Sequence, residues 1–186
     1  MTDVLSTPDM REVLLDAALT VLRRDGAAAL TVRSITREAG CSTTGVYTYF
    51  GGKQGLVEAI YVDGFESFDR ALMPAYQAGE LMESGRAYRR WALTHPTQYL
   101  VMFGRAVPDF VPSVAALERG IQSFGLLVDA VRASGDDDDA EQAAYHVFAT
   151  VHGYVMLELV NSEHINPAEL GVLYEAGLQH VMRSLS

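Results

Sequence analysis

The segment from Leu30 to Leu56 constrains the fold more than any other part of the chain, because it predicts two short helices joined by a tight turn. Thr31 is a candidate N-cap, and apolar residues at helical spacing predict a helix over residues 32–39. Gly40 follows this stretch and can adopt the left-handed conformation that ends a helix. The turn after Gly40 is short enough to set the next helix at a steep angle. We therefore expect a helix-turn-helix that leads at once into a longer helix.

The second helix is expected over residues 43–50, with Ser42 as its cap and two glycines at its end. Val46 and Phe50 occupy the inward positions. An ordinary solvated helix carries Lys, Glu and Gln on its outward face, whereas this one carries Thr43, Thr44, Gly45, Tyr47 and Thr48. Small side chains let another surface approach the backbone closely, as a helix that reads base edges in DNA requires. An ordinary helical corner would show the same spacing, so the pattern alone leaves both interpretations open.

The run GVYTYFGGKQGL makes the interpretation more specific. With the residues TVRSITREAGCST before it, this run resembles the N-terminal DNA-binding domain of the tetracycline-repressor (TetR) family of transcriptional regulators. The family pattern has a small apolar residue, Tyr, any residue, Tyr or His, Phe, a two-residue link, Lys and a later apolar residue. The positions that fit this pattern are Val46, Tyr47, Tyr49, Phe50, Lys53 and Leu56.

The resemblance implies a role for each residue of the interface. Tyr47, Tyr49 and Lys53 would contact phosphates, and Arg33 would reach a base from the preceding helix. Arginine can bond a guanine bidentately, threonine can bond a base edge or touch a thymine methyl, and lysine neutralises phosphate as a point charge. The complete expected DNA-binding set is Thr31, Arg33, Ser42, Thr43, Thr44, Gly45, Tyr47, Thr48, Tyr49 and Lys53.

The net charge opposes DNA binding at first sight, since the chain carries a formal charge of −10. The distribution of charge answers this objection. Residues 1–53 hold six basic and six acidic side chains, so the remaining residues carry the whole excess, with eight basic against eighteen acidic. Because a neutral DNA-binding segment attracts DNA only weakly, we expect affinity to depend on a homodimer that engages two half-sites of a double-stranded operator, with a steep salt dependence.

The whole chain is expected to be all-α, with about nine helices, because helical periodicity recurs and no long alternating run of β-branched residues appears. We predict a three-helix DNA-binding domain over residues 1–52 and a helical ligand-binding and dimerisation domain over residues 53–186. Thr7 and Pro8 would open the first helix. A connector helix of about twenty residues should run from Lys53 and end near Pro74, because proline disfavours helix in the residue before it.

The segment SGRAYRRWALTHPTQYLVMFG predicts a helix to about Thr94, a break at His95 and a short helix through Phe103. It resembles the regulatory domain of the WHG type found in one branch of the TetR family. That type has a Trp-x-x-x-His-Gly pattern, for which this chain has Phe148, His152 and Gly153. Because phenylalanine replaces the tryptophan, the resemblance implies a similar fold but gives no ground to expect the same ligand.

Pro112 begins the next expected helix, whose apolar stripe consists of Val114, Leu117, Ile121, Phe124, Val128 and Val131. Four aspartates at 136–139 would then open a helix over about 138–161, where a solvated helix N-terminus explains them better than a metal site. A last helix is expected over 167–185. The TetR resemblance implies that the last two helices form the dimer, although burial within one chain explains their pattern equally well. The candidate dimer residues are Ala144, Val147, Val151, Val155, Leu173, Tyr174, Gly177 and Val181.

Aromatic residues and methionines recur at helical spacing in the second half of the chain, where core packing is their commonest role. Our hypothesis is that some of them also line a site for a small apolar or aromatic effector beside the connector helix. An effector there would shift the connector, change the separation of the two recognition helices and release DNA, as in a repressor. The candidate effector-binding residues are Trp91, His95, Tyr99, Met102, Phe103, Phe124, Phe148, His152 and Met156.

Other classes of function find little support. No nucleophile elbow, zinc-protease motif or phosphate-binding glycine loop occurs, so we expect no enzyme, no cofactor and no metal site. Cys41 is the only cysteine and is expected to be a small buried residue of the turn. No apolar run approaches the length of a membrane span and the start of the chain lacks a signal peptide, so a cytoplasmic protein without a membrane partner is expected. The alternative function is a helical ligand-binding or interaction protein that does not bind an operator.

Overall fold

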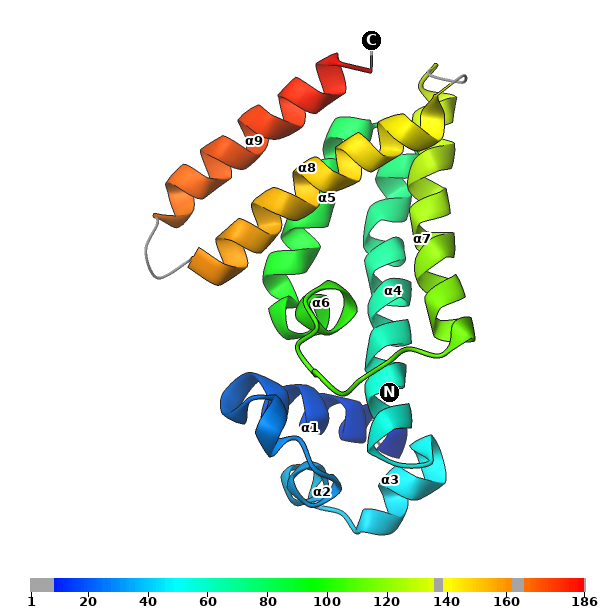
Figure 1. Ribbon diagram of the computed structural model, residues 1–186, viewed down its shortest axis with the longest axis vertical. Helices are drawn as coiled ribbons and strands as arrows, with labels where there is room; N and C mark the ends of the chain where they lie inside the picture. Colours follow the sequence, from blue (N-terminus) through cyan, green and yellow to red (C-terminus); the bar gives the residue numbers. More distant parts are fainter. Residues whose placement is uncertain (1–8, 136–138, 162–165, 186) are drawn as a thin grey trace, which may run out of the picture. The chain divides into compact units, whose positions relative to one another are not determined.

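The computed structural model describes residues 9–135, 139–161 and 166–185 (Figure 1). Within these ranges the chain forms nine α-helices and one short 3-10 turn, and no strand, which confirms the all-α prediction. None of these helices is long and apolar enough to cross a membrane. The helices are α1 Met10–Asp25, α2 Val32–Ala39, α3 Thr43–Phe50, α4 Lys53–Gln77, α5 Leu81–Thr94, α6 Pro96–Phe103, α7 Val114–Ala133, α8 Ala140–Asn161 and α9 Pro167–Arg183, with the 3-10 turn at Ala27–Ala29.

The chain divides into two compact units, and the division is not a single cut in the sequence. The first unit contains the residues up to Gly64 together with Thr97–Ala116, and the second contains Phe65–Pro96 and Leu117–Ser186. Helix α4 contributes residues to both units. The predicted domain boundary between residues 52 and 53 differs from this compact division and stays a prediction.

The first unit is built on α1, which packs against both α2 and α3. Its core contains fully buried aliphatic side chains from all three helices, including Leu14, Ile35 and Val46. The side chain of Asp9 caps α1 by accepting a hydrogen bond from the backbone N–H of Arg11. The expected opening residues, Thr7 and Pro8, lie outside the described residues.

Helix α4 does not end near Pro74 as predicted, but continues through it to Gln77 and reaches 25 residues. Proline removes one hydrogen-bond donor, but the helical turn that follows is closed, since the N–H of Ala78 donates to the carbonyl of Pro74 at 3.1 Å. Burial of Ala75 on the next position favours continued helix. The helix ends where Gly79 adopts a φ of +70°. The break at His95 and the short helix α6 agree with the prediction.

In the second unit, α8 and α9 lie side by side and both pack against α5 (Figure 1). Close approach is possible because Gly85 of α5 lies against Leu178, and Gly177 of α9 lies against the ring of Tyr154. Tyr174 Oη also donates a 2.5 Å hydrogen bond to the carbonyl of Gly85. These contacts join α5 to α8 and α9, which follow it at a distance in the sequence.

The predicted apolar stripe of α7 is wrong in its first half. Val114, Leu117 and Ile121 are exposed by 73%, 47% and 69%, whereas Ser123 is buried. The buried face of α7 turns inward because Arg119 and Ser123 donate hydrogen bonds to Asp69 of α4. The helix begins at Val114 rather than Pro112, after Ser113 Oγ accepts a hydrogen bond from the N–H of Ala116. The start of α8 expected at Asp138 lies outside the described residues.

Candidate nucleic-acid interface

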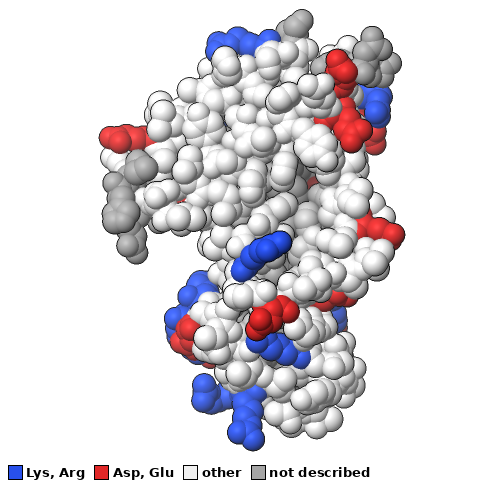
Figure 2. Space-filling model, in the orientation of Figure 1, with Lys and Arg blue, Asp and Glu red and all other residues white. Residues whose placement is uncertain are grey.

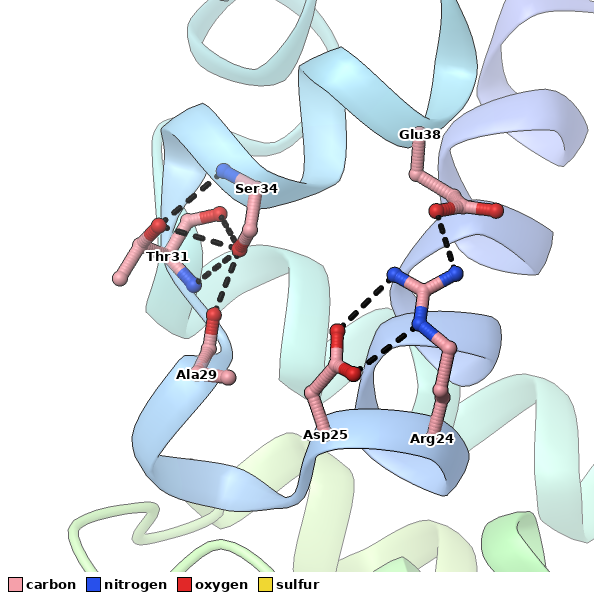
Figure 3. Close-up of polar contacts among 6 residues, drawn as sticks. All are labelled: Arg24, Asp25, Ala29, Thr31, Ser34 and Glu38. Atoms are coloured by element: carbon pink, nitrogen blue, oxygen red, sulfur yellow. Dashed lines mark hydrogen bonds and ion pairs between the residues drawn. The ribbon is translucent and has the colours of Figure 1, made fainter.

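A reciprocal pair of hydrogen bonds fixes the start of α2 (Figure 3). The N–H of Ser34 donates to Thr31 Oγ1 at 3.1 Å, and the N–H of Thr31 donates to Ser34 Oγ at 2.9 Å. The Ser34 hydroxyl also lies 2.6 Å from the carbonyl oxygen of Ala29, to which it donates. Thr31 therefore caps α2 as predicted. The helix ends at Gly40, which adopts the left-handed conformation with a φ of +66°.

The turn that follows places α3 as expected, with two differences of detail. Ser42 occupies the N-cap position of α3, but its side chain makes no capping hydrogen bond, so its hydroxyl is not consumed by the cap. Cys41 is partly exposed rather than buried. Gly51 ends the helix in the left-handed conformation, and Gly52, at a φ of +131°, completes the link to α4.

The outward face of α3 is exposed as the sequence predicts. Thr43, Thr44 and Thr48 are accessible, while Val46 is completely buried. Tyr47 and Tyr49 expose 60% and 48% of their surface, more than tyrosines in folded domains usually do. The face therefore presents hydroxyl groups together with two aromatic rings.

Gly45 is the exception to this outward face. A Cβ built on Gly45 would lie 3.5 Å from Cδ1 of Leu14 in α1 and 4.0 Å from the sulfur of Cys41. The glycine is therefore turned toward α1, not outward as expected.

Two of the acidic side chains in this unit form ion pairs with one arginine (Figure 3). Arg24 bonds both carboxylate oxygens of Asp25 and, at 2.9 Å, the carboxylate of Glu38. The Arg24 guanidinium lowers the pKa of Asp25, which keeps this exposed carboxylate ionised and compensated. The negative charges of Asp25 and Glu38 are thus compensated by Arg24 of the same unit.

Arg33, Arg37 and Lys53 are among the cations of the unit that form no ion pair with any residue that the structure describes. Figure 2 shows basic side chains projecting from the end of the unit at which α2 and α3 lie. Sequence reasoning missed Arg37, although its position four residues after Arg33 places both on the same face of α2. Residues 1–53 therefore carry no net charge, but α2 and the start of α4 present cations that form no ion pair.

Helices α1 to α3 with the start of α4 are called the recognition unit below. Arg11 links the helices of this unit, and sequence reasoning missed it. Its guanidinium bonds both carboxylate oxygens of Asp63 in α4, at 3.1 and 3.0 Å, and lies over the ring of Phe50 at 5.8 Å from the centroid. One side chain of α1 thus contacts both α3 and α4. No local pattern could reveal a pair 52 residues apart in the sequence.

The predicted effector-binding residues fall into both compact units. Tyr99, Met102 and Phe103 belong to the first unit, where the rings of Tyr99 and Phe103 are 4.9 Å apart. The other six belong to the second unit, where all but Met156 are linked through ring contacts to Phe68 and Tyr88, which sequence reasoning missed. These six are Trp91, His95, Phe124, Phe148, His152 and Met156.

The aromatic residues of the second unit form a connected cluster. Phe68 meets Tyr88 and Trp91 edge to face, with centroids 5.1 and 5.3 Å away. Phe148 contacts Tyr88 and Phe124 edge to face and stacks on His152 at 5.2 Å. The polar atoms are satisfied within the cluster, since Trp91 Nε1 donates to Ser67 Oγ at 3.1 Å and Tyr88 Oη lies 3.3 Å from His152 Nδ1.

Most of the candidate dimer residues are buried within a single chain. Leu173, however, is 51% exposed. Other accessible apolar side chains of α8 and α9 are Leu157, Val160 and Val172. The candidates that pack α8 and α9 within the chain are Ala144, Val147, Val151, Val155, Tyr174 and Val181, while Gly177 is partly accessible and lies against Tyr154.

Family models match both halves of the chain. The model described as "Bacterial regulatory proteins, tetR family" matches residues 14–60, and "Tetracyclin repressor-like, C-terminal domain" matches residues 81–181. The HTH-type transcriptional regulator Rv1816 of Mycobacterium tuberculosis is 29% identical over 132 residues, which are 63% of this chain and 56% of that protein. The chain thus spans little more than half the length of this relative. The nicotine-responsive transcriptional repressor HdnoR of Paenarthrobacter nicotinovorans is 35% identical over 68 residues, 37% of this chain and 35% of the repressor.

Solved structures share the fold over nearly the whole chain. SCO4313, a protein assigned a regulatory role, superposes with a TM-score of 0.79 at 25% identity, covering 92% of this chain and 94% of its own. A regulatory protein of the TetR family from Rhodococcus RHA1 has a TM-score of 0.69 at 19% identity, covering 94% and 98%, and shows the fold alone.

The helical fold, the exposed face of α3 and the matches to known proteins together place the chain in the class of helix-turn-helix transcriptional regulators. Within that class, the chain belongs to the TetR family. The family and the matched relatives are regulators of transcription, which confirms that the protein is not an enzyme. The WHG subtype of the second half stays a prediction.

Proposed function

We propose that the protein is a homodimeric repressor that binds a palindromic operator and is released by a small apolar or aromatic effector. The observation that carries the proposal is the exposed face of α3, where three threonines and two tyrosines stand beside the unpaired cations Arg33 and Lys53. Residues 1–52 would read DNA, and residues 53–186 would bind the effector and pair the two copies.

The proposal needs a dimer because one recognition unit offers little affinity. Residues 1–53 carry no net charge, so attraction to DNA depends on a few phosphate contacts from unpaired cations. Two copies related by a two-fold axis would present their recognition helices to half-sites about 34–36 Å apart. A palindromic operator matches that symmetry.

The accessible apolar side chains on α8 and α9 support pairing through these helices. Leu157, Val160, Val172 and Leu173 are each more than half exposed. Exposed apolar side chains on two helices that pack together are typical of a protein interaction surface. The buried members of the predicted dimer set would act indirectly, by holding α8 against α9.

The aromatic cluster of the second unit supports an apolar or aromatic effector. Its polar atoms already bond one another, so a ligand would gain chiefly from ring contacts and apolar burial. The relative HdnoR is named as nicotine-responsive, and a small aromatic effector of this protein would be chemically similar. By linkage, operator DNA must lower the affinity for the effector by the same factor as the effector lowers operator affinity.

The experiment that tests DNA binding is selection of bound sequences from random DNA duplexes, followed by measurement of variants. Lys53→Ala should weaken binding to all sequences alike, because lysine contacts a phosphate. Arg33→Ala should relax the preference at one base position, by about 1–3 kcal/mol. Arg183→Ala removes an exposed cation in the last turn of α9 and serves as the matched control, with no expected effect.

The same selection distinguishes the proposed function from the alternative function. If the parent protein enriches no sequence from random duplexes, a helical interaction protein without an operator is the better interpretation. Effector binding is tested separately, by measuring thermal stability and operator binding in the presence of diverse apolar aromatic compounds. A compound that stabilises the protein without releasing DNA would contradict the repressor mechanism.

A further inference from the structure

A cavity of about 470 Å³ opens in the second unit, at the ends of four helices. Gly79 and Glu80 follow the end of α4, Ser134 follows α7, and Met182 lies in the last turn of α9. The remaining lining residues are Leu81, Met82, Glu83 and Arg86 of α5 and Leu185 after α9. The volume falls within the range of small-molecule sites. None of these residues belongs to the aromatic cluster.

The apolar part of the lining can adapt to ligands of different shape. Two leucines and two methionines, Leu81, Met82, Met182 and Leu185, form it. Methionine is flexible and polarisable, and surfaces rich in it accommodate a range of apolar groups. The cavity therefore suits a short alkyl chain or a ring.

The helix ends around the cavity give it a negative field. Helices α4, α7 and α9 all present their C-terminal ends, and only α5 presents its N-terminal end. Each helix C-terminus acts as about half a negative charge and each N-terminus as about half a positive charge, so the helix ends leave a net charge of roughly −1.

The charged side chains add to this field. Arg86 is the only cation that lines the cavity, and Glu175 engages its guanidinium at 2.6 and 3.2 Å. Glu83 is shared between Arg86 and Arg90, at 3.6 and 3.0 Å. Glu80 is exposed and pairs with no cation in the described parts of the chain.

The cations in the last turns of α7 and α9 lie outside the lining of the cavity. Arg132 of α7 is bonded to Asp129 at 2.8 Å, and neither Arg132 nor Arg183 lines the cavity. A carboxylate without an ion pair and residues at three helix C-termini thus line the same cavity as four apolar side chains. A ligand that complements both features has a positive charge and an apolar body.

We propose that this cavity is a second ligand site, which takes a small organic cation such as an apolar amine or a quaternary ammonium compound. The cationic group would lie between Glu80 and the helix C-termini, and the apolar part would lie on Met82, Met182 and Leu185. The site is separate from the aromatic cluster, and its existence does not depend on operator binding.

The test uses the full chain labelled with ¹³C at the methionine methyl groups, with hexyltrimethylammonium bromide as the probe. Hexanol and sodium hexanoate are the matched neutral and anionic probes. Titration should shift the methyl resonances of Met82 and Met182, and leave those of Met102 and Met156 unchanged. The cation should bind about tenfold more tightly than hexanol, because only the cation gains from the field, and hexanoate should bind more weakly still.

Two variants separate a charge effect from a packing effect. Glu80→Gln should weaken binding of the cation roughly two- to fivefold, as expected for a partly exposed ion pair, and leave hexanol binding unchanged. Glu141→Gln, at an exposed carboxylate in the first turn of α8, should change neither. Equal binding of the three probes, an unchanged affinity in Glu80→Gln, or shifts confined to Met102 and Met156 would each overturn the proposal.

Discussion

Thr31 carries two expected roles, as the cap of α2 and as part of the DNA-binding face. Loss of its hydroxyl in Thr31→Ala should cost about 1 kcal/mol of stability, because the N–H of Ser34 loses its acceptor. Thr31→Ser keeps the hydroxyl and should retain most of the stability. Urea unfolding measures both free energies. Equal losses in the two variants would show that the methyl group and not the cap matters.

His152 makes stability depend on pH. Burial lowers its pKa below the ordinary value of 6.5, and its Nδ1 lies 3.3 Å from Tyr88 Oη. The unfolded chain therefore binds a proton at this residue at a higher pH than the folded chain. Stability from this group is complete above pH 6.5 and is lost as the pH falls below that value.

The corresponding measurement is the free energy of unfolding of the parent and of His152→Gln between pH 5 and 8. The parent should lose more stability than the variant on the acidic side, since the variant has no such group. Identical pH profiles would contradict the assignment. A profile in which the parent loses stability on the alkaline side would contradict the sign.

Single residues show where local sequence signals suffice. Thr31 was predictable as a cap because its position before an apolar period is distinctive. The partner Ser34 was not, because the usual box has Glu or Gln at that position. The outward positions of α3 followed from helical spacing, whereas the orientation of Gly45 toward α1 required knowledge of the packing.

At the scale of helices, the α8–α9 contact depends on a missing side chain. A Cβ on Gly177 would overlap Cε2 and Cζ of the Tyr154 ring, so that either the ring or the helix would have to shift. Gly177→Ala should therefore cost about 1–3 kcal/mol, through separation of the two helices. Gly125→Ala is the matched control, because nothing lies within 4 Å of a Cβ there. The control should be neutral or gain up to about 1 kcal/mol, as alanine favours helix.

Thermal or denaturant unfolding of the two variants measures the difference. An equal effect of both substitutions would mean that helix propensity and not packing decides the outcome. A stabilised Gly177→Ala would show that Tyr154 adopts another rotamer at little cost.

The ends of helices were predictable where a local sequence signal sets them. Ends and buried faces that depend on tertiary packing were less predictable. Gly40 and the His95–Pro96 pair marked true boundaries. At Pro74 the local signal was overridden near the helix end, and α4 continued to Gln77. The rotation of α7 was not predictable, because it follows from hydrogen bonds to Asp69, 50 and 54 residues away in sequence.

At the scale of the whole molecule, DNA affinity and association should be coupled. Leu173→Asp places a charge on the exposed apolar surface of α9 and should convert a dimer to a monomer. Light scattering measures the mass, and fluorescence anisotropy with operator DNA measures affinity at several salt concentrations. The variant should bind more weakly, and the slope of log affinity against log salt should fall to about half, because half of the phosphate contacts are lost.

Val114→Asp is the matched control for this prediction. It introduces the same charge at a 73% exposed valine of α7, outside the α8–α9 surface. This control should keep the mass and the salt slope of the parent. Dissociation by Val114→Asp, with an intact dimer in Leu173→Asp, would move the dimer surface to α7.

The sequence could not identify the dimer surface or the effector site at this scale. Small and branched side chains such as Val147 and Val151 give the same periodicity whether they face their own chain or another. The aromatic cluster joins Phe68 to Phe124 and Phe148 across long separations, which spacing along one helix does not show.

The turn between α2 and α3 contains the only cysteine of the chain, Cys41, and its side chain is partly exposed. A nitroxide attached there would mark each protomer once, within the recognition unit and without any engineered site. Pulsed electron resonance between the two labels of a dimer would then report the distance between the recognition units directly. If an effector releases the operator as proposed, the change in this distance becomes measurable in solution, in the native sequence.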